Sequence, residues 1–283
     1  MLIHKLRDSS PAAHVHKRQV LTRSVRDTAA VLDGIAGMEL GGPYAAPPIP
    51  ASYLDLLGEP FDRPLRIAKW TVGFEDIPIA AECVAALELA ETLLTRLGHE
   101  VVDAPLPPIQ FSQFVKAQIE VLSATVTLTV NGKIGHLPDS SWRERLEPAL
   151  LDAYDFGKNL SAGSYALAID QFHTVGRQLA GYMADYDLVL TPTLTQLPAK
   201  LGVITMKDDF RSFRQKISRY TAFTAIINAS GQPAANLPLH STEDGLPVGV
   251  QLISGFGCEA DLLRISAHLE AASPWMPKLS SKF

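Results

Sequence analysis

The chain has 283 residues, of which 47% are hydrophobic and 19% are charged, and its formal net charge is −5 at pH 7. This composition is typical of a folded globular protein with a sizeable core and excludes an intrinsically disordered chain. The 25 basic residues form no block, so the sequence gives no indication of nucleic-acid binding.

The sequence indicates neither a membrane span nor a secretory leader. No apolar run approaches the length that crosses a bilayer, and residues 1–5 lack the hydrophobic core of a signal peptide. We therefore predict a cytoplasmic protein. Cys83 and Cys258 stand in apolar, helix-like surroundings without a shared motif, which predicts two buried thiols in a reducing compartment.

The first 19 residues are rich in basic and histidine side chains and show no regular apolar period. We predict a poorly ordered tail over residues 1–19. A metal site built from His4, His14 and His16 is disfavoured. Side chains two positions apart do not share a helix face, and no acidic or thiol ligand follows nearby.

A helix is predicted to begin at Ser24, because Ser24 and Asp27 have the spacing of a capping residue and a favourable acidic first turn. Apolar residues then recur at helical spacing until Gly37 ends the segment. Residues 38–64 are rich in proline and glycine, which predicts an extended linker with one short helical turn at residues 52–58.

Residues 66–103 predict a strand, a helix and a second strand. The expected elements are a strand at Arg66–Trp70, an amphipathic helix at Ile79–Leu97 and a strand at Glu100–Asp103. This order favours a parallel pair of strands joined by a crossover helix. No G-x-G-x-x-G motif opens the helix, so a dinucleotide-binding unit is not favoured.

The middle of the chain, from Phe111 to Leu179, is predicted to be helical. An apolar strand at residues 186–193 then ends in Thr-Pro-Thr, and ligands commonly bind beyond the carboxyl ends of strands in α/β sheets. A helix is expected over Phe210–Phe223.

The segment Asn228–Ile253 predicts a helix end followed by two short strands. Ser230-Gly231 ends the helix, and Pro233 and Pro238 are expected to bracket a short strand. Asp244-Gly245 indicates a turn, and residues 248–253 read as a buried strand. A last amphipathic helix is predicted at residues 260–272.

Two segments, Leu21–Gly37 and Asn228–Gly255, resemble the amidase signature family, the Ser-Ser-Lys amide hydrolases. The resemblance covers residues 20–276 in the family's order, leaving residues 277–283 as a tail. Within the family the chain is similar to the bacterial amidases grouped with 6-aminohexanoate-cyclic-dimer hydrolase. The resemblance implies an α/β/α fold, with a mixed β-sheet flanked by helices. It also implies hydrolysis of amide C–N bonds without metal or organic cofactor.

The family's reaction needs a nucleophilic serine, a bridging serine, a general-base lysine and a Gly-rich oxyanion loop. In the family these precede the segment that begins here at Val20, and no Gly-Ser-Ser-Gly-Gly-type run occurs in the sequence. No catalytic residue is therefore assigned. The resemblance makes Gln118 and Glu120 candidates for substrate contact, but a solvated helix face is the preferred explanation for both. The predicted substrate-binding residues are Thr191, Thr193, Thr195 and Asn228.

Three functions are open at this point. The first is an amidase of which this chain is the later part, inactive alone and associating with itself or with a complementing chain. The second is a non-catalytic scaffold or small-amide-binding protein derived from the family. The third is an unrelated hydrolase using Ser161 and His173, which is disfavoured because Ser161 has no G-x-S-x-G context. Neither nucleic acid nor membrane is expected as a partner.

Overall fold

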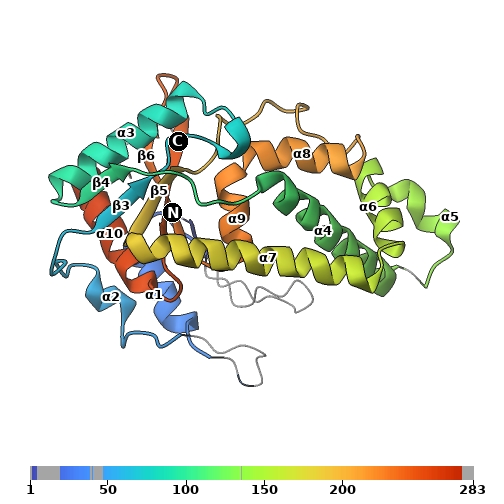
Figure 1. The fold of residues 1–283 in the computed structure, drawn as a ribbon, viewed down its shortest axis with the longest axis horizontal. Helices are drawn as coiled ribbons and strands as arrows, with labels where there is room; N and C mark the ends of the chain where they lie inside the picture. The colour runs from blue at the N-terminus through green and yellow to red at the C-terminus, as the bar shows by residue number, and fades with distance from the viewer. Residues whose placement is uncertain (1, 5–19, 39, 41–46, 135, 276–283) are drawn as a thin grey trace.

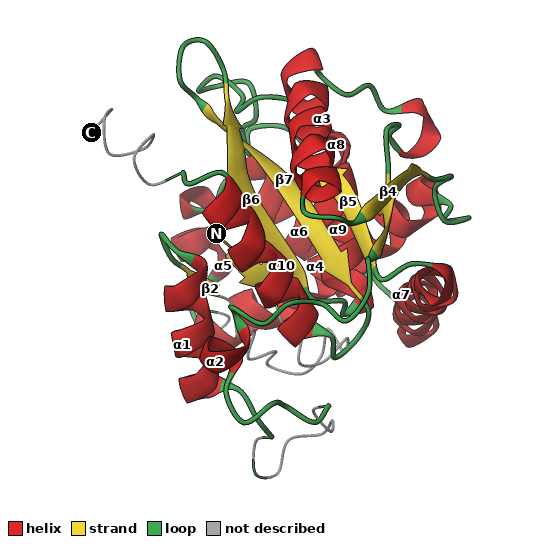
Figure 2. Cartoon of the chain, turned by 90° about the vertical axis from the view of Figure 1, so that its left-hand side faces the viewer, coloured by secondary structure: helices red, strands yellow, loops and turns green. Residues whose placement is uncertain are grey.

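A computed structural model describes residues 2–4, 20–38, 40, 47–134 and 136–275. The described chain is a seven-stranded mixed sheet with helices packed on both faces (Figures 1 and 2), which confirms the predicted α/β fold. The sheet order is β2-β1-β6-β7-β5-β3-β4. The strands are β1 (Leu2–His4), β2 (Val20–Leu21), β3 (Arg66–Lys69), β4 (Glu100–Asp103), β5 (Leu188–Pro192), β6 (Ala234–Ser241) and β7 (Pro247–Ser254).

The helices differ widely in length, and the longest ones lie in the middle of the chain. They are α1 (Val25–Ile35), α2 (Tyr53–Leu56), α3 (Ala81–Arg96), α4 (Phe111–Lys133), α5 (Asp139–Trp142), α6 (Pro148–Lys158), α7 (Ala162–Tyr182), α8 (Phe210–Tyr220), α9 (Ala222–Ser230) and α10 (Glu259–Ala272). Short 3-10 turns occur at Phe74–Asp76, Arg143–Arg145 and Met183–Asp185.

Strand β5 lies inside the sheet, parallel to β3 and antiparallel to β7. All five of its residues are buried, which fits an uninterrupted apolar strand covered on both faces. The predicted strand-helix-strand unit of residues 66–103 is confirmed, because β3 and β4 are parallel and α3 connects them.

Side chains of the sheet alternate between two hydrophobic clusters. Leu188 and Leu252 belong to a cluster shared with α1, α3 and α10. Val189 and Ile253 belong to a second cluster shared with α4, α7 and α9. Figure 2 shows α3 and α10 in front of the sheet, with α4 and α9 behind it.

Three local predictions differ from the structure. Strand β6 continues through Pro238, because a register shift between Leu237 and His240 accommodates the residue that cannot donate. The helix expected over residues 210–223 is two helices, α8 and α9, separated at Thr221. Cys83 is buried as predicted, but Cys258 is exposed, since it precedes α10 where the chain reaches the surface.

Within the tail predicted over residues 1–19, Leu2–His4 form strand β1 between β2 and β6. The strand forms because Leu2–His4 pair with β2 and β6, which are distant in the sequence. The composition of residues 1–19 therefore gives no indication of it. Residues 5–19, which include His14 and His16, and the tail at 277–283 lie outside the described residues. The predicted cap of α1 is confirmed, since Ser24 Oγ accepts from the Asp27 backbone N–H at 3.1 Å.

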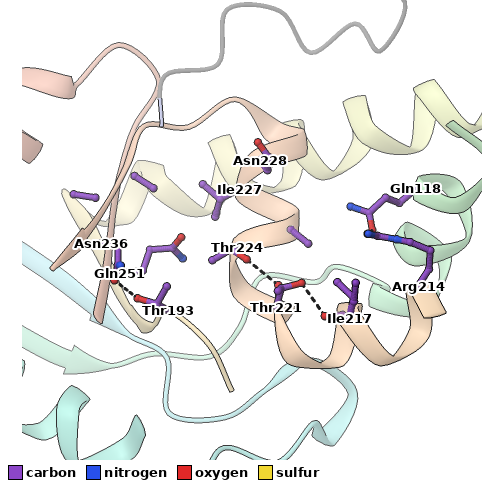
Figure 3. A pocket seen from close by; sticks show the side chains of 13 residues that line it. Gln118, Thr193, Arg214, Ile217, Thr221, Thr224, Ile227, Asn228, Asn236 and Gln251 are labelled. Atoms are coloured by element: carbon purple, nitrogen blue, oxygen red, sulfur yellow. Dashed lines mark hydrogen bonds between the residues drawn. The ribbon is translucent and has the colours of Figure 1, made fainter. Parts of the chain in front are cut away.

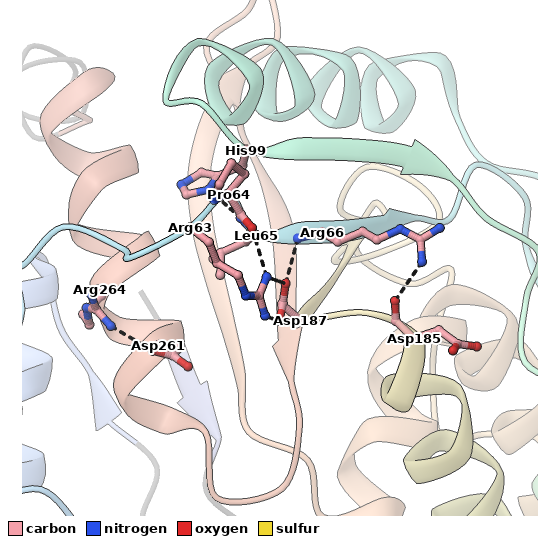
Figure 4. Close-up of polar contacts among 9 residues, drawn as sticks. All are labelled: Arg63, Pro64, Leu65, Arg66, His99, Asp185, Asp187, Asp261 and Arg264. Atoms are coloured by element: carbon pink, nitrogen blue, oxygen red, sulfur yellow. Dashed lines mark hydrogen bonds and ion pairs between the residues drawn. The ribbon is translucent and has the colours of Figure 1, made fainter.

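A polar cluster joins the start of β5 to the loop before β3 (Figure 4). The Asp187 carboxylate accepts two hydrogen bonds from the Arg63 guanidinium, at 2.7 and 2.6 Å, and one from the Arg66 backbone N–H at 2.8 Å. The hydrogen bonds from Arg63 are the main reason why the pKa of Asp187 lies below its ordinary value. Beside this cluster, the Leu65 N–H donates to Nδ1 of His99 at 3.2 Å.

The His99 contact predicts that the protein loses stability as the pH falls. His99 is buried, and burial is the main cause that lowers its pKa below the ordinary value. The ring must stay deprotonated at Nδ1 to accept from Leu65, so the unfolded chain binds the proton more readily. The stabilisation is complete above the unfolded pKa, about 6.5, and decreases as the pH falls below it.

Urea unfolding at pH 7.5 and pH 5.5 measures this effect, and the H99Q variant should show a smaller pH dependence than the wild type. The pKa of His268 is also lowered, mainly by burial, so H99Q is expected to reduce the dependence without abolishing it. An unchanged pH dependence in H99Q would exclude His99 as its source.

Candidate functional site

A cavity of about 330 Å³ opens beyond the carboxyl end of β5, between the sheet and the helices α4, α8 and α9 (Figure 3). Its position matches the rule that ligands bind at the carboxyl ends of strands in α/β sheets. Its lining consists of Gln118, Thr193, Arg214, Ile217, Thr221, Thr224, Ala225, Ile227, Asn228, Ala234, Ala235, Asn236 and Gln251.

A row of polar side chains crosses three strands at one side of this pocket. Gln251 of β7 is in register with Thr191 of β5 and with Asn236 of β6, so the three residues lie on the same face of the sheet. The Gln251 Nε2 donates to the Thr191 hydroxyl at 3.1 Å, and the Thr193 hydroxyl donates to Oδ1 of Asn236. The row holds amide and hydroxyl groups in fixed positions at the pocket wall.

The close approach of Thr193 and Asn236 depends on Gly249. A Cβ atom at Gly249 would lie 2.1 Å from Oδ1 of Asn236 and 3.0 Å from Oγ1 of Thr193. The Thr193 N–H also donates to the carbonyl of Gly249 at 3.2 Å. The missing side chain therefore leaves the space that the Asn236 amide occupies.

Helices α8 and α9 supply the opposite wall. Thr221, Thr224 and Asn228 are three and four residues apart, a spacing that places them on one helix face. The Thr224 hydroxyl donates to the Thr221 carbonyl at 3.2 Å, and the Thr221 hydroxyl donates to the Ile217 carbonyl at 2.9 Å. Figure 3 shows these side chains between the strand row and Arg214.

Arg214 and Gln118 form the far end of the pocket. The Arg214 Nη2 donates to Oε1 of Gln118, whereas its Nε is buried and has no hydrogen-bond partner among the described residues. Burial lowers the pKa of Arg214 below the ordinary arginine value. The pocket thus has a neutral amide-hydroxyl end and a cationic end.

The chemistry of the lining is suited to binding. Among the described residues that line the pocket, none is a carboxylate, histidine, cysteine, lysine or serine. Proton transfer and nucleophilic attack ordinarily use these groups. The described part of the chain also brings no three His, Cys, Asp or Glu side chains together as a possible metal site.

Of the four predicted substrate-binding residues, Thr193 and Asn228 line the pocket. Thr191 is fully buried behind the lining, where it accepts from Gln251. The Thr195 hydroxyl points elsewhere and donates to the carbonyl of Arg219 at 2.9 Å. No measured ligand contact tests these four roles, so they stay predictions.

Sequence reasoning assigned no role to most of the lining, including the polar residues Asn236, Gln251 and Arg214. An amide side chain within each of two predicted apolar strands was the available signal for Asn236 and Gln251. Arg214 gave no local signal. Gln118, for which the sequence favoured a solvated helix face over substrate contact, lines the pocket.

The alternative pair Ser161 and His173 is not brought together. Ser161 caps α7, where its Oγ accepts from the Ser164 N–H at 3.0 Å, and His173 lies on the same helix. Twelve residues of helix separate them by about 18 Å along the axis. This distance excludes a nucleophile-base pair. No helix in the described residues is long and apolar enough to cross a membrane.

The sequence of the chain is similar to those of several curated amide hydrolases. It is 29% identical to the 6-aminohexanoate-cyclic-dimer hydrolase of Pseudomonas sp. (strain NK87), over 96% of this chain and 56% of that protein. It is 32% identical to the putative amidase AmiC of Mycobacterium leprae (strain TN), over 90% of this chain and 52% of that protein. The chain therefore spans about half the length of these relatives.

The fold is also similar to solved structures. A structure of 6-aminohexanoate cyclic dimer hydrolase matches with a TM-score of 0.85 and 25% identity, covering 97% of this chain and 61% of that chain. A bacterial aryl acylamidase of the amidase signature family shares the fold with a TM-score of 0.81, at 20% identity, over 98% of this chain and 59% of that one. The family model named Amidase matches residues 11–263. Since this match covers most of the sequence, the chain belongs to the amidase family.

Proposed function

We propose that the chain supplies the substrate-binding wall of an amide-hydrolysing site. The row of Thr193, Asn236 and Gln251 carries the proposal, because it presents both donors and acceptors at the pocket. An amide substrate needs both, an acceptor for its N–H and a donor for its C=O. A serine-serine-lysine centre would come from a complementing segment or chain outside these 283 residues.

Preorganisation of the row supports this function. Gln251 is 3% exposed and is held by Thr191, and Thr193 is held by Asn236, so these side chains lose little freedom when a ligand binds. The apolar side chains Ile217 and Ile227 complete the lining and suit the hydrocarbon part of a substrate.

A second function, a non-catalytic small-amide-binding protein, is favoured by one observation. The described lining holds no carboxylate, histidine, cysteine or lysine that could act as a general base toward its threonine hydroxyls, which suits binding without proton transfer. Both proposed functions use the same amide-binding row. They differ in whether the bound amide is hydrolysed.

We expect N236A to weaken binding of the neutral diamide adipamide by about three- to tenfold, because the Thr193 hydroxyl loses its acceptor and the ligand loses an amide partner. Isothermal titration calorimetry measures the affinity. N159A is the matched control, since Asn159 is exposed at the end of α6 and bonds within that helix. Equal losses in both variants would contradict the proposed role of the row.

The chain alone should release no ammonia from adipamide, and supplying the complementing segment should restore release if the first function is correct. Turnover by the purified chain that N236A alters would contradict the need for that segment. Binding without turnover, even with a segment that carries the serines and lysine, would favour the non-catalytic function.

A further inference from the structure

We propose that the pocket selects amides that carry a carboxylate at the end remote from the amide, and that Arg214 binds this carboxylate. The inference rests on the proposed function, because it assumes that the amide lies against Thr193, Asn236 and Gln251. The inference specifies the charge of the ligand and the order of its groups, neither of which follows from the amide-binding row.

Arg214 differs from the other partly buried arginines in its hydrogen-bond and ion-pair partners. Only three arginines in the described residues are not exposed, namely Arg143, Arg214 and Arg264. Arg143 pairs with Asp155, and Arg264 pairs with Asp261 at 3.1 Å. Arg214 has no carboxylate within ion-pair distance among the described residues, and its hydrogen-bond partner is the neutral amide of Gln118.

The surroundings of Arg214 favour an anion from outside the protein. Removing a guanidinium from water is unfavourable unless a counter-charge offsets the loss of hydration. The buried Nε of Arg214 has no partner among the described residues, and the described lining contains no acidic side chain. A ligand carboxylate would supply both the charge and a hydrogen-bond acceptor.

Gln118 holds the guanidinium for this role. The Gln118 Oε1 accepts from Nη2, and none of the three guanidinium nitrogens has a carboxylate partner in the described chain. A planar guanidinium can donate two parallel hydrogen bonds to a carboxylate, and such charge-assisted pairs are strong in a water-poor site. Gln118 is thus a positioning residue, whereas Arg214 contacts the ligand.

The two ends of the pocket define the substrate class. Figure 3 shows Arg214 and Gln118 on one side and Thr193, Asn236 and Gln251 on the other, with Thr221 and Thr224 between them. A linear ω-carboxy amide, with an apolar chain between its two ends, fits this order of groups. A neutral diamide would fill the amide end and leave Arg214 unpaired.

The test compares two series of probes by calorimetry on the full chain. One series contains the monoamides from succinamate to adipamate, and the other contains the neutral diamides from succinamide to adipamide. For the chain length that fits, we expect the monoamide to bind about tenfold to hundredfold more tightly than the matching diamide. R214M should remove this preference, so that a monoamide and its matching diamide bind the variant with affinities within about twofold of each other.

R211M is the matched control, because Arg211 is exposed on the same helix and does not line the pocket. R214K keeps the charge without the planar fork and should give an intermediate preference, which also covers the case that R214M fails to fold. Equal affinities of the wild type for the two series would overturn the proposal. A preference for the monoamide that persists in R214M, or that R214K retains in full, would also overturn it. Diamide binding weakened by N236A would then still support the amide site, whereas no binding of either series would refute both proposals.

Discussion

Replacing Gly157 with alanine is expected to lower the free energy of unfolding by about 3 kcal/mol, at the upper end of the usual cost of overpacking. Gly157 lies on α6 where this helix touches α4. An added Cβ would lie 2.3 Å from the Ser123 carbonyl oxygen and 2.3 Å from Oγ1 of Thr127. The Thr127 hydroxyl is already engaged by the carbonyls of Ser123 and Tyr154, one on each helix, so the helices must separate.

G181A is the control for this substitution. Gly181 is exposed near the end of α7, and a Cβ there meets no atom within 4 Å. Alanine at that position should raise the free energy of unfolding by about 0.5 to 1 kcal/mol, through its better helix propensity. Urea unfolding of both variants measures the difference. Equal stability of G157A and the wild type would show that α4 and α6 can move apart freely.

The second large effect is expected for W70A, which should lower the free energy of unfolding by about 3 to 5 kcal/mol. Trp70 is fully buried at the end of β3, and its Nε1 donates to the Tyr182 hydroxyl at 2.9 Å. Its ring centroid lies 5.7 Å from that of Phe74 and 6.3 Å from that of Phe223. Alanine would leave a cavity that the surrounding rings fill only in part.

Y182F separates the hydrogen bond from the packing. This variant keeps the ring of Tyr182 beside Trp70 and removes only the acceptor, so the expected cost is smaller, about 1 to 3 kcal/mol. Because Phe223 belongs to α9, which lines the pocket, W70A should also weaken adipamide binding. A loss in Y182F as large as that in W70A would show that the hydrogen bond, and not the ring packing, stabilises this region.

Predictions from the sequence were correct where a local period determines the element. The strand-helix-strand order at residues 66–103 is an example, because alternation and helical spacing are both visible over a few turns. The break between α8 and α9 was missed, since its cause lies in a distant segment. The backbone N–H and the hydroxyl of Thr195 donate to the carbonyls of Tyr220 and Arg219, which satisfies the end of α8.

The pocket was only partly predictable for the same reason. Thr193 follows a strand and could be proposed from the position of ligands in α/β sheets. The contact of Thr193 with Asn236 depends on the register of three strands and on the absence of a side chain at Gly249. Arg214 is a candidate because it lacks the carboxylate partner that the other half-buried arginines, Arg143 and Arg264, have. No local pattern in the sequence reveals that difference.

The position of β5 inside the sheet has a kinetic consequence. Its partner β3 is separated from it by the whole segment from α3 to α7, so pairing Ile67 with Leu188 closes a long loop of chain. The entropy of that closure is lost before the strand contacts are gained, and topologies rich in such distant pairs fold slowly. The hairpin of β6 and β7 is joined by a short turn, so closing its loop costs less entropy. The pocket takes Thr193 from the chain beyond β5, so it is expected to form only after β5 has joined the sheet, whereas the hairpin that carries Asn236 and Gln251 can form earlier.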